Sequence, residues 1–194
     1  MVSVMPSTLF NKIDSLLQGR RESFNTTTPV FVIIDGPAGA GKTTLASQIV
    51  SHFGFGEIIH CDDLYNGWKD ALTATLERTI GEWILKPIEE SRPIQIRKFD
   101  WQRNTYGEEI TLPTTPLVIL EGVGCAMKGA AQSADLSIWM DIPVDLGLER
   151  VLARDGVEIR EEMLHWITQQ AEFFALHRNQ ENCSLHLPYG APAN

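Results

Sequence analysis

The residues best suited to chemistry lie in one short stretch, DGPAGAGKTT, which runs from Asp35 to Thr44. Gly36, four further residues and then Gly41-Lys42-Thr43 give the full spacing of a phosphate-binding loop. Glycines let the backbone turn tightly and aim several N–H groups at phosphate oxygens. The lysine supplies a mobile charge for the β- and γ-phosphates, and the threonine hydroxyl suits Mg²⁺. The expected nucleotide site consists of Gly36, Pro37, Ala38, Gly39, Ala40, Gly41, Lys42, Thr43 and Thr44.

Two acidic segments could complete such a site. The apolar run LVIL ends in Glu121-Gly122, the form of a Walker-B-type strand. Glu121 could hold Mg²⁺ through water or orient a nucleophile, and the alternative is a carboxylate that only caps a helix. Asp62 and Asp63 follow another apolar run, and one of them could face an acceptor hydroxyl or assist the metal. Neighbouring loop residues rarely point the same way, so we do not assign both.

Arginine and tryptophan side chains are the next candidates. Arg150 and Arg154 lie four residues apart on a predicted helix and so share a face. Guanidinium groups suit the charge that spreads over a transferring phosphoryl group, although a solvated face paired with nearby acids is the alternative. Trp68 and Trp101 lie in predicted loops, which makes them the tryptophans expected to contact a ligand.

These residues need a scaffold, and the chain alternates apolar runs with helical patterns. We expect strands at 30–34, 55–60, 94–99, 117–120, 136–142 and 183–187, and helices at 7–18, 42–53, from about 70, 144–154 and 160–177. This alternation predicts a three-layer α/β/α fold with a parallel central sheet. Ligands bind beyond the carboxyl ends of such strands, where Asp35, Asp62 and Glu121 should converge. Residues 1–28 are expected to form an N-terminal helix and linker, and residues 29–194 a single domain.

The bulk composition limits the partners. The net charge is −9 and the pI about 5.0, so non-specific binding to nucleic acid or to an anionic membrane is disfavoured. The three cysteines form no CxxC pair, which argues against a zinc knuckle or a disulfide framework and suits a reduced cytoplasm. No apolar stretch approaches the length of a membrane span. We expect a cytoplasmic protein without nucleic-acid or membrane partners, and a homodimer is left open.

The order of these segments resembles the uridine kinase-like branch of the P-loop kinases. That family has a glycine loop, a D-S-F-Y-type segment, a Y-D-F-type segment, an E-G strand end and an R-D lid. This chain has, in the same order, GPAGAGKT, Asp62-Asp63-Leu64-Tyr65, Phe99-Asp100-Trp101, Glu121-Gly122 and Arg154-Asp155. The resemblance covers residues 30–187, and the series also looks like a group of actinobacterial ATP-binding proteins.

The resemblance implies ATP as donor, Mg²⁺ as cofactor and a small hydroxyl-bearing acceptor such as a nucleoside, a sugar or a vitamin precursor. The lid of this chain is shorter than in the family, because Gly156 follows Arg154-Asp155 and Arg160 is the only further arginine before the long helix. The resemblance also implies catalytic roles for Lys42, Asp62, Glu121 and Arg154, and metal binding by Thr43, Asp62 and Glu121. Arg150 would join the nucleotide site. The acceptor contacts would be Asp62, Tyr65, Asp100, Trp101 and Arg103.

One departure concerns the acceptor. Uridine kinases follow the Y-D-F-type segment with a His and then an Arg that serve the nucleoside. This chain has Asn104 and Tyr106 in those places, so uridine itself is disfavoured.

Two other functions are weighed against a kinase. A nucleotide-dependent switch would need a guanine-reading N-K-x-D motif, and the chain contains NKID at Asn11–Asp14. This match precedes the glycine loop and lies inside a predicted amphipathic helix, and no D-x-x-G follows the loop, so we reject it. A protein that binds ATP without transferring phosphate is the second alternative, and the presence of Asp62, Glu121 and Arg154 speaks against it.

Overall fold

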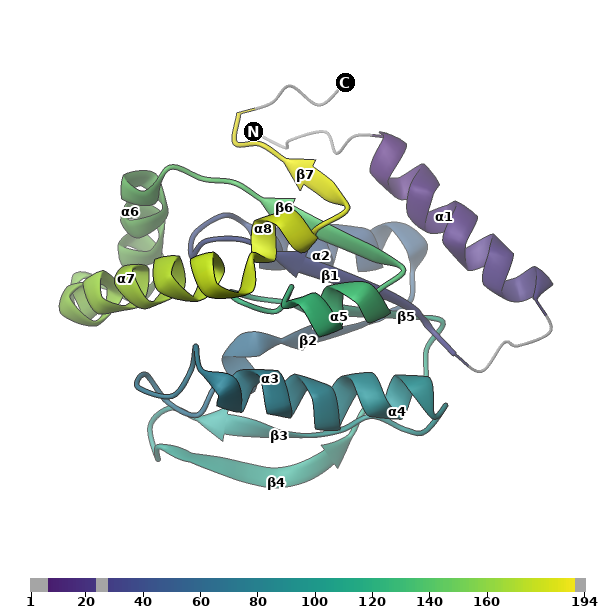
Figure 1. Cartoon of the computed structure of the whole chain (residues 1–194), viewed down its shortest axis with the longest axis horizontal. Helices are drawn as coiled ribbons and strands as arrows, with labels where there is room; N and C mark the ends of the chain where they lie inside the picture. Colours follow the sequence, from purple (N-terminus) through teal and green to yellow (C-terminus); the bar gives the residue numbers. More distant parts are fainter. Residues whose placement is uncertain (1–6, 24–27, 191–194) are drawn as a thin grey trace.

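The structure is a computed structural model that describes residues 7–23 and 28–190. Its central sheet has five parallel strands in the order β2-β5-β1-β6-β7 (Figure 1). All six residues of the central strand β1 are buried, as a strand covered on both faces requires. The strands of this sheet are β1 (Val30–Asp35), β2 (Glu57–His60), β5 (Leu117–Glu121), β6 (Leu136–Met140) and β7 (Leu185–Leu187).

Helices cover both faces of the sheet. Helix α1 (Ser7–Glu22) and helix α2 (Lys42–Phe53) pack on the face that carries Val32 and Ile34 of β1. Phe31 and Ile33 point to the other face. That face is covered by α3 (Ala74–Ile80), η2 (Gly81–Leu85), α4 (Lys86–Glu89), α5 (Lys128–Ser133), α6 (Val144–Asp155) and α7 (Arg160–His177). The predicted three-layer α/β/α fold with a parallel sheet is therefore confirmed.

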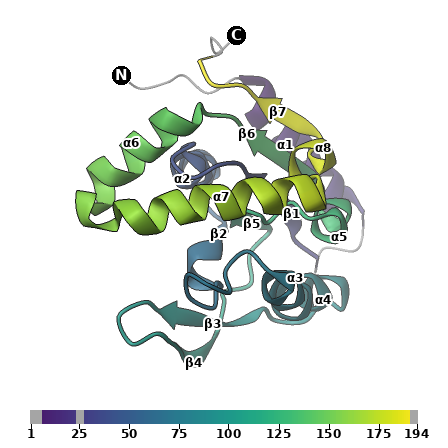
Figure 2. The ribbon, with the colours of Figure 1, turned by 60° about the vertical axis from the view of Figure 1, so that its left-hand side comes forward.

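Helices α6 and α7 meet as a V beside the end of α2 (Figure 2). The short 3-10 helix η3 (Val157–Ile159) joins them, in the place where the sequence predicts a short lid. After α7 the chain forms the short helix α8 (Asn179–Asn182) before β7.

The alternation of residues 94–99 is typical of an edge strand, and the structure does place a strand there but not at the edge of the central sheet. Strand β3 (Gln95–Asp100) does not border the central sheet but pairs with β4 (Thr105–Thr111) in a separate antiparallel hairpin. The hairpin lies on the α3–α4 side of the molecule (Figure 1). We did not predict β4 because every residue in it except Tyr106 is exposed, which leaves no apolar alternation to detect.

Several boundaries also differ from expectation. Helix α1 continues to Glu22, so the linker expected from residue 20 is shorter, and its residues 24–27 lie outside the described part of the chain. The helix expected from about residue 70 begins at Ala74, because the Thr73 hydroxyl accepts a hydrogen bond from the Thr75 N–H and caps it. Within the described ranges, no helix is long and apolar enough to cross a membrane.

Candidate active site

The glycine loop connects β1 to α2, which is the strand–loop–helix setting that the motif requires. Gly36, Gly39 and Gly41 have φ angles of 144°, 79° and 94°. A Cβ atom on Gly36 would lie 2.2 Å from the Met140 carbonyl oxygen, and one on Gly39 would lie 2.4 Å from the Gly147 carbonyl oxygen. Side chains are thus excluded at both positions, and the loop places its N–H groups at the positive end of α2.

Lys42 is not the mobile charge that the sequence suggests. Its side chain is buried, and its Nζ donates to the carbonyl oxygens of Gly36 and Pro37, both at 2.8 Å. A buried ammonium group must be hydrogen-bonded to be tolerated. The positive charge is therefore already positioned across the loop.

Glu121 forms the centre of a small polar cluster. The Thr43 hydroxyl donates to Glu121 Oε1 at 2.8 Å, and His60 Nδ1 lies 2.5 Å from the same oxygen. The hydrogen bond to Glu121 raises the pKa of His60 above its usual value, although desolvation opposes the shift. His60 belongs to no metal-ligand spacing in the sequence, so sequence reasoning places it on the surface or in the core and misses this contact. One signal could have revealed this contact: His60 ends β2, and the neighbouring strand β5 ends in Glu121.

Asp62 follows His60 and Cys61 in the 3-10 helix η1 (Cys61–Asp63). Removal from water raises the pKa of its carboxyl group, and the negative charge of Glu121 adds to the effect. The positive charges of Lys42 and Arg154 act in the opposite direction. Asp62 and Glu121 thus converge on one cleft, as expected from their strand ends.

Asp63 has a different partner, because its carboxylate forms an ion pair with Lys98 of β3 at 2.8 Å. Asp63 still lines the same cleft as Asp62 and Glu121, whereas Asp35, which was expected to converge with them, does not. Asp35 is buried and accepts hydrogen bonds from the N–H groups of Gly36, Gly124 and Ala126 and from the Asn179 side chain. Asp35 therefore links the start of the phosphate loop to the segment after β5 and to α8.

The two arginines of α6 have protein partners. The Arg154 guanidinium group contacts both carboxylate oxygens of Asp155, at 2.7 and 2.6 Å, which raises its pKa further. Arg150 Nη1 donates to the Gly39 carbonyl oxygen at 3.3 Å, and its guanidinium carbon lies 5.4 Å from the centre of the Tyr189 ring. Arg150 therefore touches the phosphate loop itself.

A cavity of about 840 Å³ joins these groups. The phosphate loop lies at one part of its wall, and the Asp62 segment and two tryptophans form another. The expected site residues that line it are Ala38, Gly39, Gly41, Lys42, Thr43, Thr44, Asp62, Tyr65, Trp101, Glu121, Arg150 and Arg154. Gly36, Pro37 and Ala40 lie in the loop but are not among the lining residues.

Asp100 and Arg103 do not line the cavity. The Asp100 carboxylate accepts hydrogen bonds from the N–H groups of Gln102 and Arg103, at 3.0 and 2.9 Å, and so closes the turn between β3 and β4. Their roles as acceptor contacts stay predictions.

Aromatic rings form the wall near Asp62. Trp68 lies 5.3 Å from Trp101 and 5.8 Å from Trp166, measured between ring centres, and both pairs are edge-to-face. The Trp101 indole N–H donates to the Asp62 carbonyl oxygen at 3.0 Å. Trp68 and Trp101 are 40% and 39% exposed, and their contact with a ligand stays a prediction. Trp166 of α7 also lines the cavity and was expected only to pack.

Known proteins resemble this chain both in sequence and in structure. No family model matches the chain. A uridine kinase from Ureaplasma parvum is 27% identical over 161 residues, which cover 75% of this chain and 78% of that protein. A cytidylate kinase from Pyrococcus furiosus is 27% identical over 135 residues, 69% of this chain and 62% of that protein. A solved structure described as a possible uridine kinase from Bacillus stearothermophilus superposes with a TM-score of 0.61 at 16% identity, over 93% of this chain and 99% of that one.

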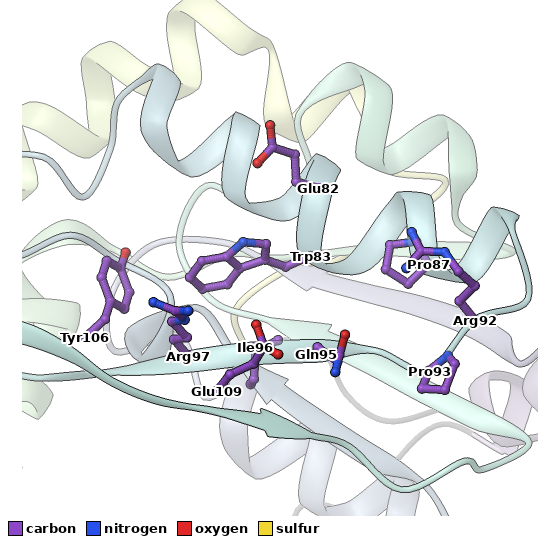
Figure 3. A pocket seen from close by; sticks show the side chains of 10 residues that line it. All are labelled: Glu82, Trp83, Pro87, Arg92, Pro93, Gln95, Ile96, Arg97, Tyr106 and Glu109. Atoms are coloured by element: carbon purple, nitrogen blue, oxygen red, sulfur yellow. The ribbon is translucent and has the colours of Figure 1, made fainter.

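The chain is similar in sequence to uridine kinases and similar in fold to a P-loop kinase of that kind, which supports the resemblance to the uridine kinase-like family. It departs from the family pattern at Asn104 and Tyr106, and neither residue lines the large cavity. The Tyr106 hydroxyl donates to the Leu64 carbonyl oxygen at 2.7 Å, so it braces the segment that carries Asp62. Its ring lies 5.6 Å from that of Trp83, at the edge of a second hollow of about 310 Å³ between η2 and the hairpin (Figure 3).

The oxygen donors at the cavity suit a magnesium ion that is shared with phosphate. Among the described residues, no group of three or more His, Cys, Asp and Glu side chains could hold a metal ion alone. The Thr43 hydroxyl and the Glu121 carboxylate are hard oxygen ligands in contact with each other. Mg²⁺ in nucleotide sites typically takes one or two such protein ligands and completes its shell with phosphate and water. The donor set therefore fits that kind of ion.

Proposed function

We propose that this protein transfers the γ-phosphoryl group of ATP to a hydroxyl group of a small molecule. One observation carries the proposal: a single cavity contains the phosphate loop, the Thr43–Glu121 pair and the Asp62 segment with its aromatic wall. Phosphoryl transfer needs a donor and an acceptor in line, with positive charge on the donor and a carboxylate near the acceptor oxygen. The volume of about 840 Å³ lies within the range typical of small-molecule sites.

On the donor side, the loop N–H groups and the preplaced Lys42 ammonium group would hold the phosphates. Arg150 and Arg154 would approach the phosphates from α6, and Arg154 must then exchange its contact with Asp155 for phosphate oxygens. Thr43 and Glu121 would hold Mg²⁺, which would neutralise charge on the phosphates. Proteins of this family supply position and electrostatic stabilisation rather than covalent chemistry.

On the acceptor side, we assign Asp62 as the group that accepts the hydroxyl proton. A general base works best when its pKa lies near the working pH, and desolvation moves the pKa of Asp62 in that direction. Tyr65 and Trp101 would position the acceptor. Tyr65 is buried and its hydroxyl donates to the Val123 carbonyl oxygen, so it shapes the floor rather than moving.

The cytoplasm is the proposed setting of this activity. Cys61, Cys125 and Cys183 are all buried and none is in a disulfide, which suits a reducing compartment. The relatives are named as kinases of uridine and of cytidylate.

Two measurements test the proposal. In a thermal-shift series, ATP with Mg²⁺ should raise Tm more than GTP does, and binding at a hundredfold excess over Kd stabilises by about 2.7 kcal/mol. An ADP-coupled screen of nucleosides, sugars and other alcohols should then identify an acceptor. Saturable ATP binding with no turnover on any alcohol would favour an ATP-binding protein without transferase activity, and a larger shift with GTP would favour a switch.

A further inference from the structure

Both helices of the V hold the phosphate loop directly. Gly147 of α6 packs so closely that a Cβ atom there would lie 2.6 Å from the Ala38 carbonyl oxygen, and Arg150 donates to Gly39. From α7, Gln170 Oε1 accepts a hydrogen bond from the Ala38 N–H at 3.2 Å. The loop is thus held from α6 by backbone packing and from α7 by one side chain.

Gln170 is unusual in its surroundings. The buried residues of α7 are Met163, Trp166, Gln170 and Phe173, so a single amide interrupts an otherwise apolar face. The Gln170 side chain is only 4% exposed. A buried amide lowers stability unless it is hydrogen-bonded, and its known partner here is a backbone group of the phosphate loop. Packing alone would favour an apolar residue at this position.

The same face of α7 reaches the other part of the cavity. Trp166 lies four residues before Gln170, which places both side chains on one side of the helix. The Trp166 ring lies 5.2 Å from Tyr65 and 5.8 Å from Trp68, and it lines the cavity. Helix α7 therefore contacts the donor loop through Gln170 and the acceptor wall through Trp166.

We propose that Gln170 is a positioning residue that couples the phosphate loop to the acceptor wall through α7. Its hydrogen bond with Ala38 holds the loop in the conformation that binds phosphate. A conformational change of the loop would then move α7 and with it Trp166. This inference rests on the proposed nucleotide site. Because coupling between two sites is reciprocal, nucleotide binding should then order the acceptor wall, and an acceptor should tighten nucleotide binding.

The test compares Gln170→Met with the control Gln169→Met, which makes the same chemical change at the next, half-buried residue of α7. Calorimetry with ADP and Mg²⁺ should show a Kd roughly 5- to 100-fold higher for Gln170→Met, because the Ala38 N–H loses its partner. Hydrogen exchange over 160–177 should slow on ADP binding in the wild type and in the control. In Gln170→Met, with ADP saturating, that slowing should be absent.

Gln170→Glu provides a second, independent variant. Its carboxylate can still accept from the Ala38 N–H, so the exchange of the ligand-free loop, residues 36–44, should match the wild type. The added negative charge should weaken ATP binding more than ADP binding, since ATP carries more charge. A role limited to stability would lower Tm in Gln170→Met and leave both the ADP affinity and the response of α7 unchanged.

Three sets of results would support or overturn the role proposed for Gln170. The inference is overturned if Gln170→Met binds ADP within twofold of the wild type and keeps the exchange response of α7, or if Gln169→Met shows the same losses. If the wild type binds no nucleotide, the proposed function and the nucleotide step fail together. Hydrogen exchange of the loop, residues 36–44, in the ligand-free variants then tests the contact between Gln170 and Ala38. Faster exchange in Gln170→Met than in Gln169→Met supports that contact, and equal rates contradict it.

Discussion

Thr43 and Glu121 are 78 residues apart in the chain, and Thr43 Oγ1 donates to Glu121 Oε1 at 2.8 Å. The contact forms because parallel β1 and β5 are neighbours, so that the helix after one strand begins beside the end of the other. The two oxygens that we expect to share a magnesium ion thus lie side by side in the fold.

Thr43→Val removes the hydroxyl group with little change in volume. We expect ADP affinity to become independent of Mg²⁺, while affinity measured in EDTA stays near that of the wild type. Ser47→Ala, an exposed position one turn further along α2, is the control. Calorimetry with and without Mg²⁺ checks the prediction, and a variant that kept the full magnesium effect would remove Thr43 from the metal site.

Lys42→Met keeps most of the side-chain volume and removes the charge. We expect turnover to fall by roughly 10²- to 10³-fold, the usual loss for one preorganised group that stabilises developing charge. The protein should remain folded by circular dichroism, because the apolar stem still fills the buried site. Lys12→Met, at an exposed residue of α1, should leave turnover unchanged. Wild-type turnover in Lys42→Met would contradict the phosphate-loop assignment.

Asp62→Asn should lower turnover by roughly two to four orders of magnitude, the range for loss of a general base. ATP affinity should change little, because the shape of the side chain is kept. Asp63→Asn is the matched comparison and should cost much less, since Asp63 pairs with Lys98. Steady-state kinetics and ATP titration on both variants separate the roles. The reverse ranking would assign the base to Asp63.

His60 should make stability depend on pH. Its pKa is raised in the folded state, chiefly by the hydrogen bond to Glu121, so its contribution is complete below its unfolded pKa of about 6.5 and is lost as pH rises through the folded value. The stability difference between wild type and His60→Gln should therefore shrink as pH rises from about 6.5 through the folded pKa of His60. Urea unfolding in EDTA across this range measures it, with exposed His165→Gln as the control. A difference that grew with pH would mean that the imidazole is neutral against Glu121.

Uridine and cytidine should be poor acceptors. Tyr106 is bound to Leu64 and packed against Phe99 and Trp83, so it cannot turn to serve a nucleoside as the family's arginine does. A site with the wrong polar partners discriminates strongly, and we expect kcat/KM on the order of 10³-fold or more below that of the best acceptor found. Efficient phosphorylation of uridine would show that other groups have replaced the missing pair.

The sequence alone determined the phosphate loop, the parallel sheet and the order of the site segments. These features depend on local patterns: glycine spacing sets a backbone turn, and buried strands read as continuous apolar runs. Asp62 and Glu121 could be assigned to one edge because the carboxyl ends of parallel strands meet there. Residues 94–99 read correctly as a strand, but their alternation contained no information about which partner they pair with.

Only the tertiary structure decided the contacts between distant segments. Lys42 folds back on the loop carbonyls, His60 joins Glu121, and Gln170 reaches Ala38 across 132 positions of the chain. A lone histidine or glutamine in a sequence has no pattern that reveals its partner, because the partner is chosen by helix packing and strand order.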